Sequence, residues 1–306
     1  MDIPAWIPVT LMAALFQAWR TALQANLRHE LSASGAAFVR YLYALPLDVF
    51  LLGVAWWFFR PETWSLSPEL ILLCMAGGIS QIFGTFFLIS AFQHRNFVVG
   101  TAYAKTEAVQ LILISVLIFG IALPPWAIVG AVVAMMGAIW LSVPVEQFTL
   151  KGWMRASVQP AALFGLGAGF AFALTALALR EATLTMDVGQ PVLFKALLVL
   201  FVTNGLQTLI QGGYMLRFER PQLRRCAAAW RRATPVGVLS ALGSAAWFTG
   251  FALTQVALVR GLGQIEIVFT LLFGHFFLKE RYRRGEVIAL ILVASGVLVI
   301  ALAGLH

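Results

Sequence analysis

Two glutamates lie inside long apolar stretches of the sequence and have polar or aromatic neighbours at helical spacing. Tyr103 and Gln110 lie four residues before and three residues after Glu107, and Thr270 lies four residues after Glu266. Residues three or four apart share one face of a helix. A charged side chain at the centre of a bilayer costs about 2.5–3.5 kcal/mol, so we expect both faces to line a wet interior. There each carboxylate would bind a substrate amine or a coupling proton.

A third polar face is predicted on the first apolar stretch, where Gln17, Arg20 and Gln24 occur, and Arg40 lies within the second stretch. We expect Gln17 to line the same interior. Arg20 or Arg40 would balance the glutamates or meet a substrate carboxylate. Two alternatives remain open, because Arg20 can extend to the lipid headgroups and Arg40 can mark a helix end and bind lipid phosphate.

Three further charges lie within apolar stretches, those of Lys105, Asp48 and Lys195. Lys105 is two residues from Glu107, about 200° around a helix, so it cannot share the face of that glutamate. We expect Lys105 to reach the headgroups or to form a salt bridge with another helix. Asp48 is interpreted as a structural hydrogen-bond acceptor or a helix-pairing residue.

The composition indicates what kind of helices carry these residues. Of 306 residues, 61% are hydrophobic and 11% are charged, whereas soluble domains are about 45–50% apolar and about 25% charged. These values exclude an ordinary soluble enzyme, a disordered tail and a secreted disulfide scaffold. Because a spanning helix takes about 20 apolar residues, the sequence predicts an all-α integral membrane protein with ten transmembrane helices. The expected spans are 7–27, 35–59, 70–92, 98–121, 125–143, 161–179, 192–210, 236–258, 261–278 and 287–305.

An internal repeat organises these spans. Glu107 and Gly137 in the first half recur as Glu266 and Gly296 in the second half, both 159 residues later. Two copies of five spans each enter the membrane in opposite senses because five is odd. Such an inverted repeat is typical of secondary transporters, whose sites lie near the bilayer midplane. We therefore expect a first five-helix repeat at 1–145, an interfacial connection at 146–160 and a second repeat at 161–306.

The segment from Gln264 to Glu280, followed by Gly285-Glu286-Val287 and Ala294-Ser295-Gly296, resembles the end of an EamA-type module. Such modules form the drug/metabolite transporter superfamily, and the resemblance covers the chain as two copies. It implies a transporter fold and a central cavity. It also implies that Tyr43 and Trp247, on helices that line that cavity in similar proteins, supply aromatic walls. The alternative for each ring is ordinary packing.

The sequence predicts no cofactor, no metal and no catalytic residue, because it lacks zinc-ligand spacing and a phosphate-binding loop. Its net charge of +8 gathers in a few connections, which indicates loops facing anionic lipid rather than nucleic acid. We therefore expect a non-enzymatic permease or exporter in the inner (plasma) membrane. Its partners would be membrane lipids and a small, amino-acid-like or amphiphilic solute, moved by alternating access, with proton coupling and oligomeric state left open. The rival hypotheses are a lipid-handling protein or intramembrane enzyme, and a membrane scaffold without transport activity.

Overall fold

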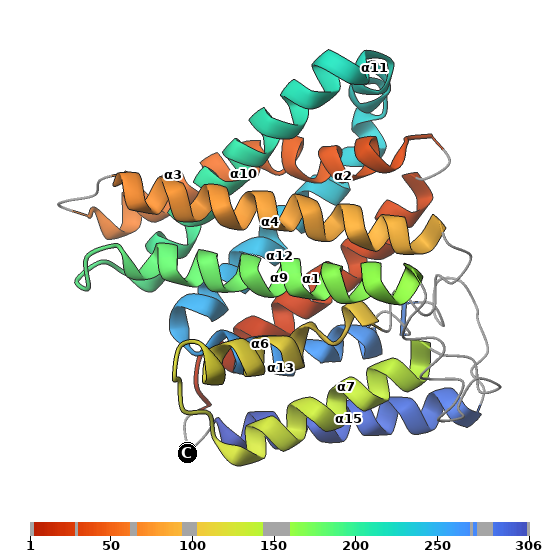
Figure 1. The fold of residues 1–306 in the computed structure, drawn as a ribbon. Helices are drawn as coiled ribbons and strands as arrows, with labels where there is room; N and C mark the ends of the chain where they lie inside the picture. The colour runs from red at the N-terminus through yellow and green to blue at the C-terminus, as the bar shows by residue number, and fades with distance from the viewer. Residues whose placement is uncertain are drawn as a thin grey trace. The chain divides into compact units, whose positions relative to one another are not determined.

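The computed structural model describes residues 3–27, 30–61, 66–93, 103–142, 160–269, 272–273 and 284–304. Throughout these ranges the regular structure is helical and no β-strand occurs (Figure 1). The helices are α1 (Trp6–Leu27), α2 (Ala33–Leu42), α3 (Leu45–Phe59), α4 (Pro68–Gln93), α6 (Glu107–Leu117), α7 (Pro125–Ser142), α9 (Pro160–Leu184), α10 (Val192–Phe218), α11 (Arg220–Ala228), α12 (Trp230–Leu253), α13 (Val256–Leu262), the 3₁₀ turn η2 (Gly263–Ile265) and α15 (Arg284–Ala303).

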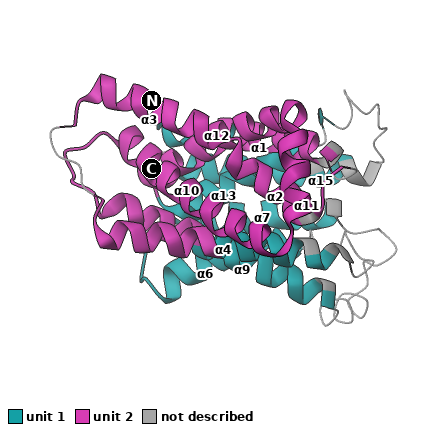
Figure 2. Cartoon of the chain, turned by 90° about the horizontal axis from the view of Figure 1, so that it is seen from above, with its two compact units in different colours: residues 1–11, 80–174, 255–306 teal, residues 12–79, 175–254 magenta. Residues whose placement is uncertain are grey.

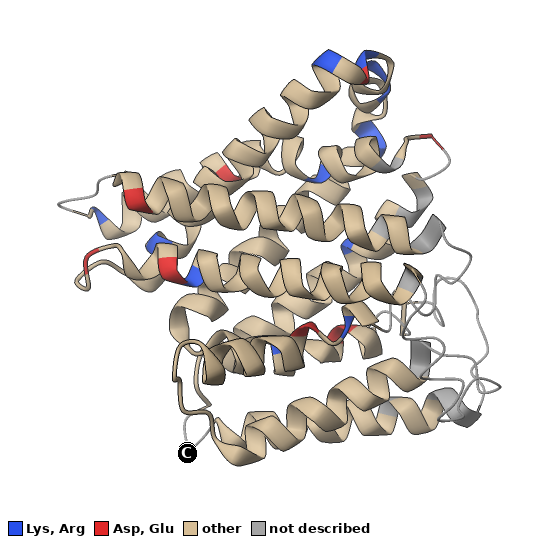
Figure 3. Cartoon of the chain, viewed as in Figure 1, with Lys and Arg blue, Asp and Glu red and all other residues tan. Residues whose placement is uncertain are grey.

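Several of these helices are long and apolar enough to cross a bilayer. Five such stretches occur in the described part of the chain, namely Ser34–Phe59, Pro68–Leu88, Ala162–Leu184, Val192–Phe218 and Trp230–Leu253. Shorter apolar helices are Glu107–Leu117, Pro125–Trp140 and Val287–Ala303. The protein is therefore a helical, multi-pass membrane protein, as the composition predicts. Figure 3 shows that long parts of these helices carry no charged residue.

The chain folds as two compact units, coloured separately in Figure 2. Unit 1 contains residues 1–11, 80–174 and 255–306, and unit 2 contains residues 12–79 and 175–254. Each unit therefore takes segments from both predicted repeats. The predicted division at 146–160 follows the repeat in the sequence and stays a prediction.

Glycines bring two helices of unit 1 close together. In α7, a Cβ at Gly137 would lie 2.7 Å from the Val293 nitrogen and 2.8 Å from the Ala289 oxygen of α15. In α15, a Cβ at Gly296 would lie 2.4 Å from the Ala134 nitrogen and 2.5 Å from the Gly130 oxygen of α7. Small residues at such positions let helix backbones approach closely within a membrane. This explains why α7 and α15 pack along each other.

Unit 2 is built around α10, which packs against α2, α3, α11 and α12. One of its apolar clusters includes Leu27, Phe38, Met215 and Val236, all at most 3% exposed. These residues come from segments far apart in the sequence, so the cluster joins α1, α2, α10 and α12.

Several stretches differ from the expected spans. The second predicted span is broken at Tyr43 and Ala44 into α2 and α3, because Pro46 has no N–H to donate and its ring disfavours a continuous helix. The eighth ends at Leu253, and the ninth starts earlier, as α13. The arginine-rich connection that the expected spans leave at 211–235 is helical, because α10 continues to Phe218, α11 starts at Arg220 and α12 starts at Trp230.

Candidate functional site

Two ion pairs in unit 1 hold the predicted glutamates. Arg260 Nε lies 3.1 Å from Glu107 Oε1, and both side chains are 15% exposed. Lys105 Nζ lies 3.6 Å from Glu266 Oε2, with side chains 23% and 15% exposed. We call these four residues the charged quartet. It contains two carboxylates and two cations, so it is neutral as a whole without binding a proton.

Both glutamates follow an interruption in helical backbone. Glu107 is the first residue of α6, after a turn at Lys105 and Thr106. Glu266 follows the 3₁₀ turn η2 at the end of α13. Interrupted helices at membrane depth occur where backbone is buried in protein or lines a cavity, and in transporters they mark binding sites. The two carboxylates are thus presented at breaks of the kind that such sites use.

The neighbours predicted for Glu107 pack around the same turn. Gln110 Nε2 donates hydrogen bonds to Thr106 Oγ1 at 2.9 Å and to the Leu166 carbonyl of α9 at 3.3 Å. Tyr103, 9% exposed, packs with Leu166 and Ala162. Tyr103 therefore packs against α9, and Gln110 fixes the turn to α9.

A glycine of α9 allows that close approach. A Cβ at Gly169 would lie 3.1 Å from the Ala104 oxygen and 3.3 Å from the Glu107 nitrogen. A side chain there would press on the backbone that presents the carboxylate.

Arg260 is a site residue that the sequence interpretation missed. The sequence predicts it in a connection between spans, whereas the structure puts it on α13, half-buried against Glu107. The signal that points to it is charge balance, because a buried carboxylate requires a cation or a proton. The salt bridge of Lys105 with another helical segment, one of two expectations for that residue, is confirmed.

The other predicted site residues lie in unit 2, except Thr270, which lies outside the described residues. Gln17 Oε1 accepts a hydrogen bond from Trp247 Nε1 at 2.9 Å, which brings these two residues together. Tyr43 donates its hydroxyl hydrogen to the Cys226 carbonyl at 3.0 Å. Arg40 lies 4.9 Å from the centre of the Tyr41 ring.

Arg20 is half-buried on α1. Thr270 lies outside the described residues. Within unit 1 the described ion pairs of the glutamates are with Arg260 and Lys105. The balancing role expected of Arg20 or Arg40 stays a prediction.

Unit 2 holds a buried carboxylate of its own. Asp48 of α3 is 0% exposed, and its Oδ2 accepts a hydrogen bond from Asn204 Nδ2 of α10 at 2.7 Å. The expected role of Asp48 as a hydrogen-bond acceptor between helices is confirmed.

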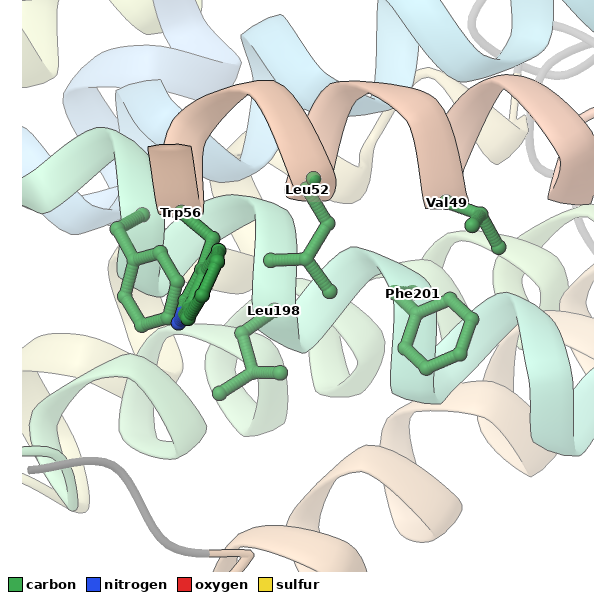
Figure 4. Close-up of a pocket in the computed structure, with 7 residues that line it drawn as sticks. Val49, Leu52, Trp56, Leu198 and Phe201 are labelled. Atoms are coloured by element: carbon green, nitrogen blue, oxygen red, sulfur yellow. The ribbon is translucent and has the colours of Figure 1, made fainter. Parts of the chain in front are cut away.

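An apolar groove of about 250 Å³ runs between α3 and α10 in unit 2. Figure 4 shows side chains of α3 facing those of α10 across it. The groove is lined by Val49, Leu52, Gly53, Trp56, Phe194, Leu198 and Phe201. Because every lining residue is apolar, the groove offers no group that would orient a charged solute, and it suits a hydrocarbon chain.

The described residues contain no cluster of three or more His, Cys, Asp or Glu side chains that could hold a metal ion. The charged quartet offers ion-pairing chemistry, because it combines two carboxylates with two cations.

Comparison with known proteins matches the second half of the chain to a family. Residues 159–302 match the EamA-like transporter family, which confirms the family predicted from the sequence. No curated protein matches the chain. Among 28 matching chains of solved structures, one crystal structure covers 98% of this chain and 97% of its own, at 15% identity and a TM-score of 0.73. At that identity the likeness shows a shared fold over the whole chain.

Proposed function

Because residues 159–302 belong to the EamA-like transporter family, within the drug/metabolite transporter superfamily, we propose that this membrane protein is a secondary transporter of a small organic solute. It works by alternating access between two inverted five-helix halves, at 1–145 and 161–306, in the inner (plasma) membrane. The observation that carries the proposal is the charged quartet in a family of solute transporters.

The glycine contacts of α7 and α15 support the inverted repeat. Gly137 meets Ala289 and Val293, whereas Gly296 meets Gly130 and Ala134. With the 159-residue offset of the repeat, positions 130, 134 and 137 of α7 correspond to positions 289, 293 and 296 of α15. The contact of 137 with 289 is therefore repeated, with the two helices exchanged, as the contact of 296 with 130. A two-fold axis produces such reciprocal contacts. The same axis is expected of an inverted repeat.

The quartet supports a zwitterionic, amino-acid-like solute. Both ion pairs join residues of the first predicted repeat to residues of the second, Glu107 to Arg260 and Lys105 to Glu266. A solute ammonium would replace a cation beside a carboxylate, and a solute carboxylate would replace a carboxylate beside a cation. Binding of a zwitterion thus exchanges one set of neutral pairs for another, and no uncompensated charge is left in the membrane. Movement of the halves would open and close these pairs.

The experiment measures thermal unfolding of the purified protein with unmodified amino acids, their N-acetyl derivatives and their methyl esters. A ligand at 100 times its dissociation constant stabilises the folded state by about 2.7 kcal/mol. We expect an unmodified amino acid to stabilise the protein, and both derivatives, which lack one charge, to have no effect. The stabilising amino acid should also be taken up by vesicles that contain the protein.

Glu107→Gln and Glu266→Gln should abolish both the stabilisation and the uptake. Glu69→Gln is the matched control, because Glu69 is an exposed glutamate in the first turn of α4. If both quartet variants take up the amino acid like the control, the quartet is structural and the proposed solute site is wrong.

A further inference from the structure

Asp48 differs from the two glutamates in having no cation. Its Oδ2 accepts one hydrogen bond, from the uncharged amide of Asn204, and its Oδ1 has no hydrogen-bond partner among the described residues. The described ion pairs of the chain do not include Asp48. The carboxylates of Glu107 and Glu266, by contrast, each face a cation.

Among the described residues, no cation forms an ion pair with Asp48. α3 packs against α10 and α12, and the central parts of both helices contain no ionisable residue. The ionisable groups of the neighbouring segments are Arg40, Tyr41, Tyr43 and Cys74. Arg40 lies over the ring of Tyr41, Tyr43 donates to a backbone carbonyl, and Cys74 is buried against α10.

An ionised carboxylate that is fully buried without a cation is costly enough that such a group becomes neutral instead. Neutrality at Asp48 requires one proton. We propose that Asp48 is a proton-binding site inside the membrane, made of other residues than the charged quartet, in which the carboxylate takes up one proton from hydronium in the aqueous phase, leaving water, and becomes a carboxylic acid. Asn204 positions the acid through the hydrogen bond to Oδ2. The use of this proton in transport rests on the proposed function, whereas the proton site itself does not.

A polar face of α10 connects Asp48 with one end of unit 2. Asn204, Gln207 and Gln211 recur at spacings of three and four, so they share one helical face. Gln207 Nε2 donates to the Gly78 carbonyl at 3.1 Å, and Gln211 Nε2 donates to the Ser34 carbonyl at 3.2 Å.

At the end of this face, the Ser34 hydroxyl donates to Glu219 Oε1 at 3.0 Å. Glu219 is half-buried where α10 meets α11. A proton that reaches Asp48 from this end would be carried by water hydrogen-bonded to these polar groups, because amides do not themselves exchange protons and the other faces of α10 are mostly apolar.

Infrared difference spectroscopy of the purified protein tests the site without any transported solute. We expect the wild-type spectrum to contain the carbonyl band of a protonated carboxylic acid. Asp48→Asn should remove the band. Asp187→Asn is the matched control, because Asp187 lies exposed in a connection between helices, and it should leave the band in place. Glu107→Gln should also leave it, since that carboxylate is paired.

A second measurement keeps the proposal testable if Asp48→Asn does not fold. The chain contains three aspartates, Asp2, Asp48 and Asp187, so selective carbon-13 labelling of aspartate should shift the band in the wild-type protein. Asn204→Leu, which removes the donor, should change the frequency of the band. The proposal is overturned if the band is absent at every pH at which the protein is folded, if aspartate labelling does not shift it, or if it survives in Asp48→Asn. A failed solute assay would leave these results unchanged.

Discussion

Breaking the ion pair of Glu107 and Arg260 should destabilise the protein far more than breaking an exposed ion pair. With 3.1 Å between Arg260 Nε and Glu107 Oε1, Coulomb's law at an effective dielectric constant of about 20 gives an attraction of about 5 kcal/mol. Glu107→Gln keeps the shape of the side chain and removes its charge. The guanidinium then remains 15% exposed without that carboxylate, and we expect a loss of about 3–5 kcal/mol.

The assay is a double-mutant cycle in mixed detergent micelles, in which circular dichroism follows unfolding by sodium dodecyl sulfate. The variants are Glu107→Gln, Arg260→Met and the two combined. The combined variant leaves no buried charge unpaired at this position. Its loss in free energy of unfolding should therefore be much smaller than the sum of the losses in the two single variants. The coupling energy should be about 3 kcal/mol, near the upper end of measured pairwise couplings.

The control is the ion pair of Arg232 with Glu30 in unit 2, whose side chains are 71% and 39% exposed. Exposed pairs contribute about 0–1 kcal/mol, so Arg232→Gln should change the free energy of unfolding very little. A coupling energy below about 1 kcal/mol for Glu107 and Arg260, or equal effects of Glu107→Gln and Arg232→Gln, would refute the reasoning.

Two further predictions concern packing and thiol reactivity. Gly296→Ala should destabilise the protein by about 1–3 kcal/mol, because a Cβ would overlap backbone atoms of Gly130 and Ala134 and overpacking has a cost of this size. In the same unfolding assay, Gly53→Ala should cause no loss of stability, because its Cβ would meet nothing within 4 Å. Burial raises the pKa of the Cys226 thiol from 9.0 to about 11, which leaves about 100-fold less thiolate near pH 8. Because thiolate is the reactive form, maleimide should label Cys226 in the folded protein at least that much more slowly than after unfolding, and equal labelling rates would contradict its burial.

Much of the fold could be predicted from the sequence because the membrane makes composition decisive. An apolar chain in a bilayer must satisfy its backbone hydrogen bonds internally, so helices follow from hydropathy alone. The first residues of α1 and α7 lie within one position of the predicted starts, and a proline at the first position of a helix, such as Pro125, marks such a start. The break between α2 and α3 was missed although Pro46 signalled it, since a proline in a membrane helix can also be accommodated by a kink.

The sequence also determined which residues carry unusual chemistry. Glu107, Glu266 and Asp48 stand out because a charge in an apolar stretch needs a compensating partner, and the 159-residue offset of the repeat is enough to relate the two glutamates to each other. These inferences depend on residue type and spacing, which the sequence contains in full.

Only the tertiary structure decided how those charges are compensated. Arg260 is 153 positions from Glu107 and Lys105 is 161 positions from Glu266, and helical periodicity relates residues only within a few turns. Which side chains meet across such separations depends on how the helices pack. Among the described residues, packing places a cation beside each glutamate and the amide of Asn204 beside Asp48. Three acids that look alike in the sequence thereby acquire two kinds of chemistry, because the free energy of a buried charge is set by the groups within a few ångströms of it.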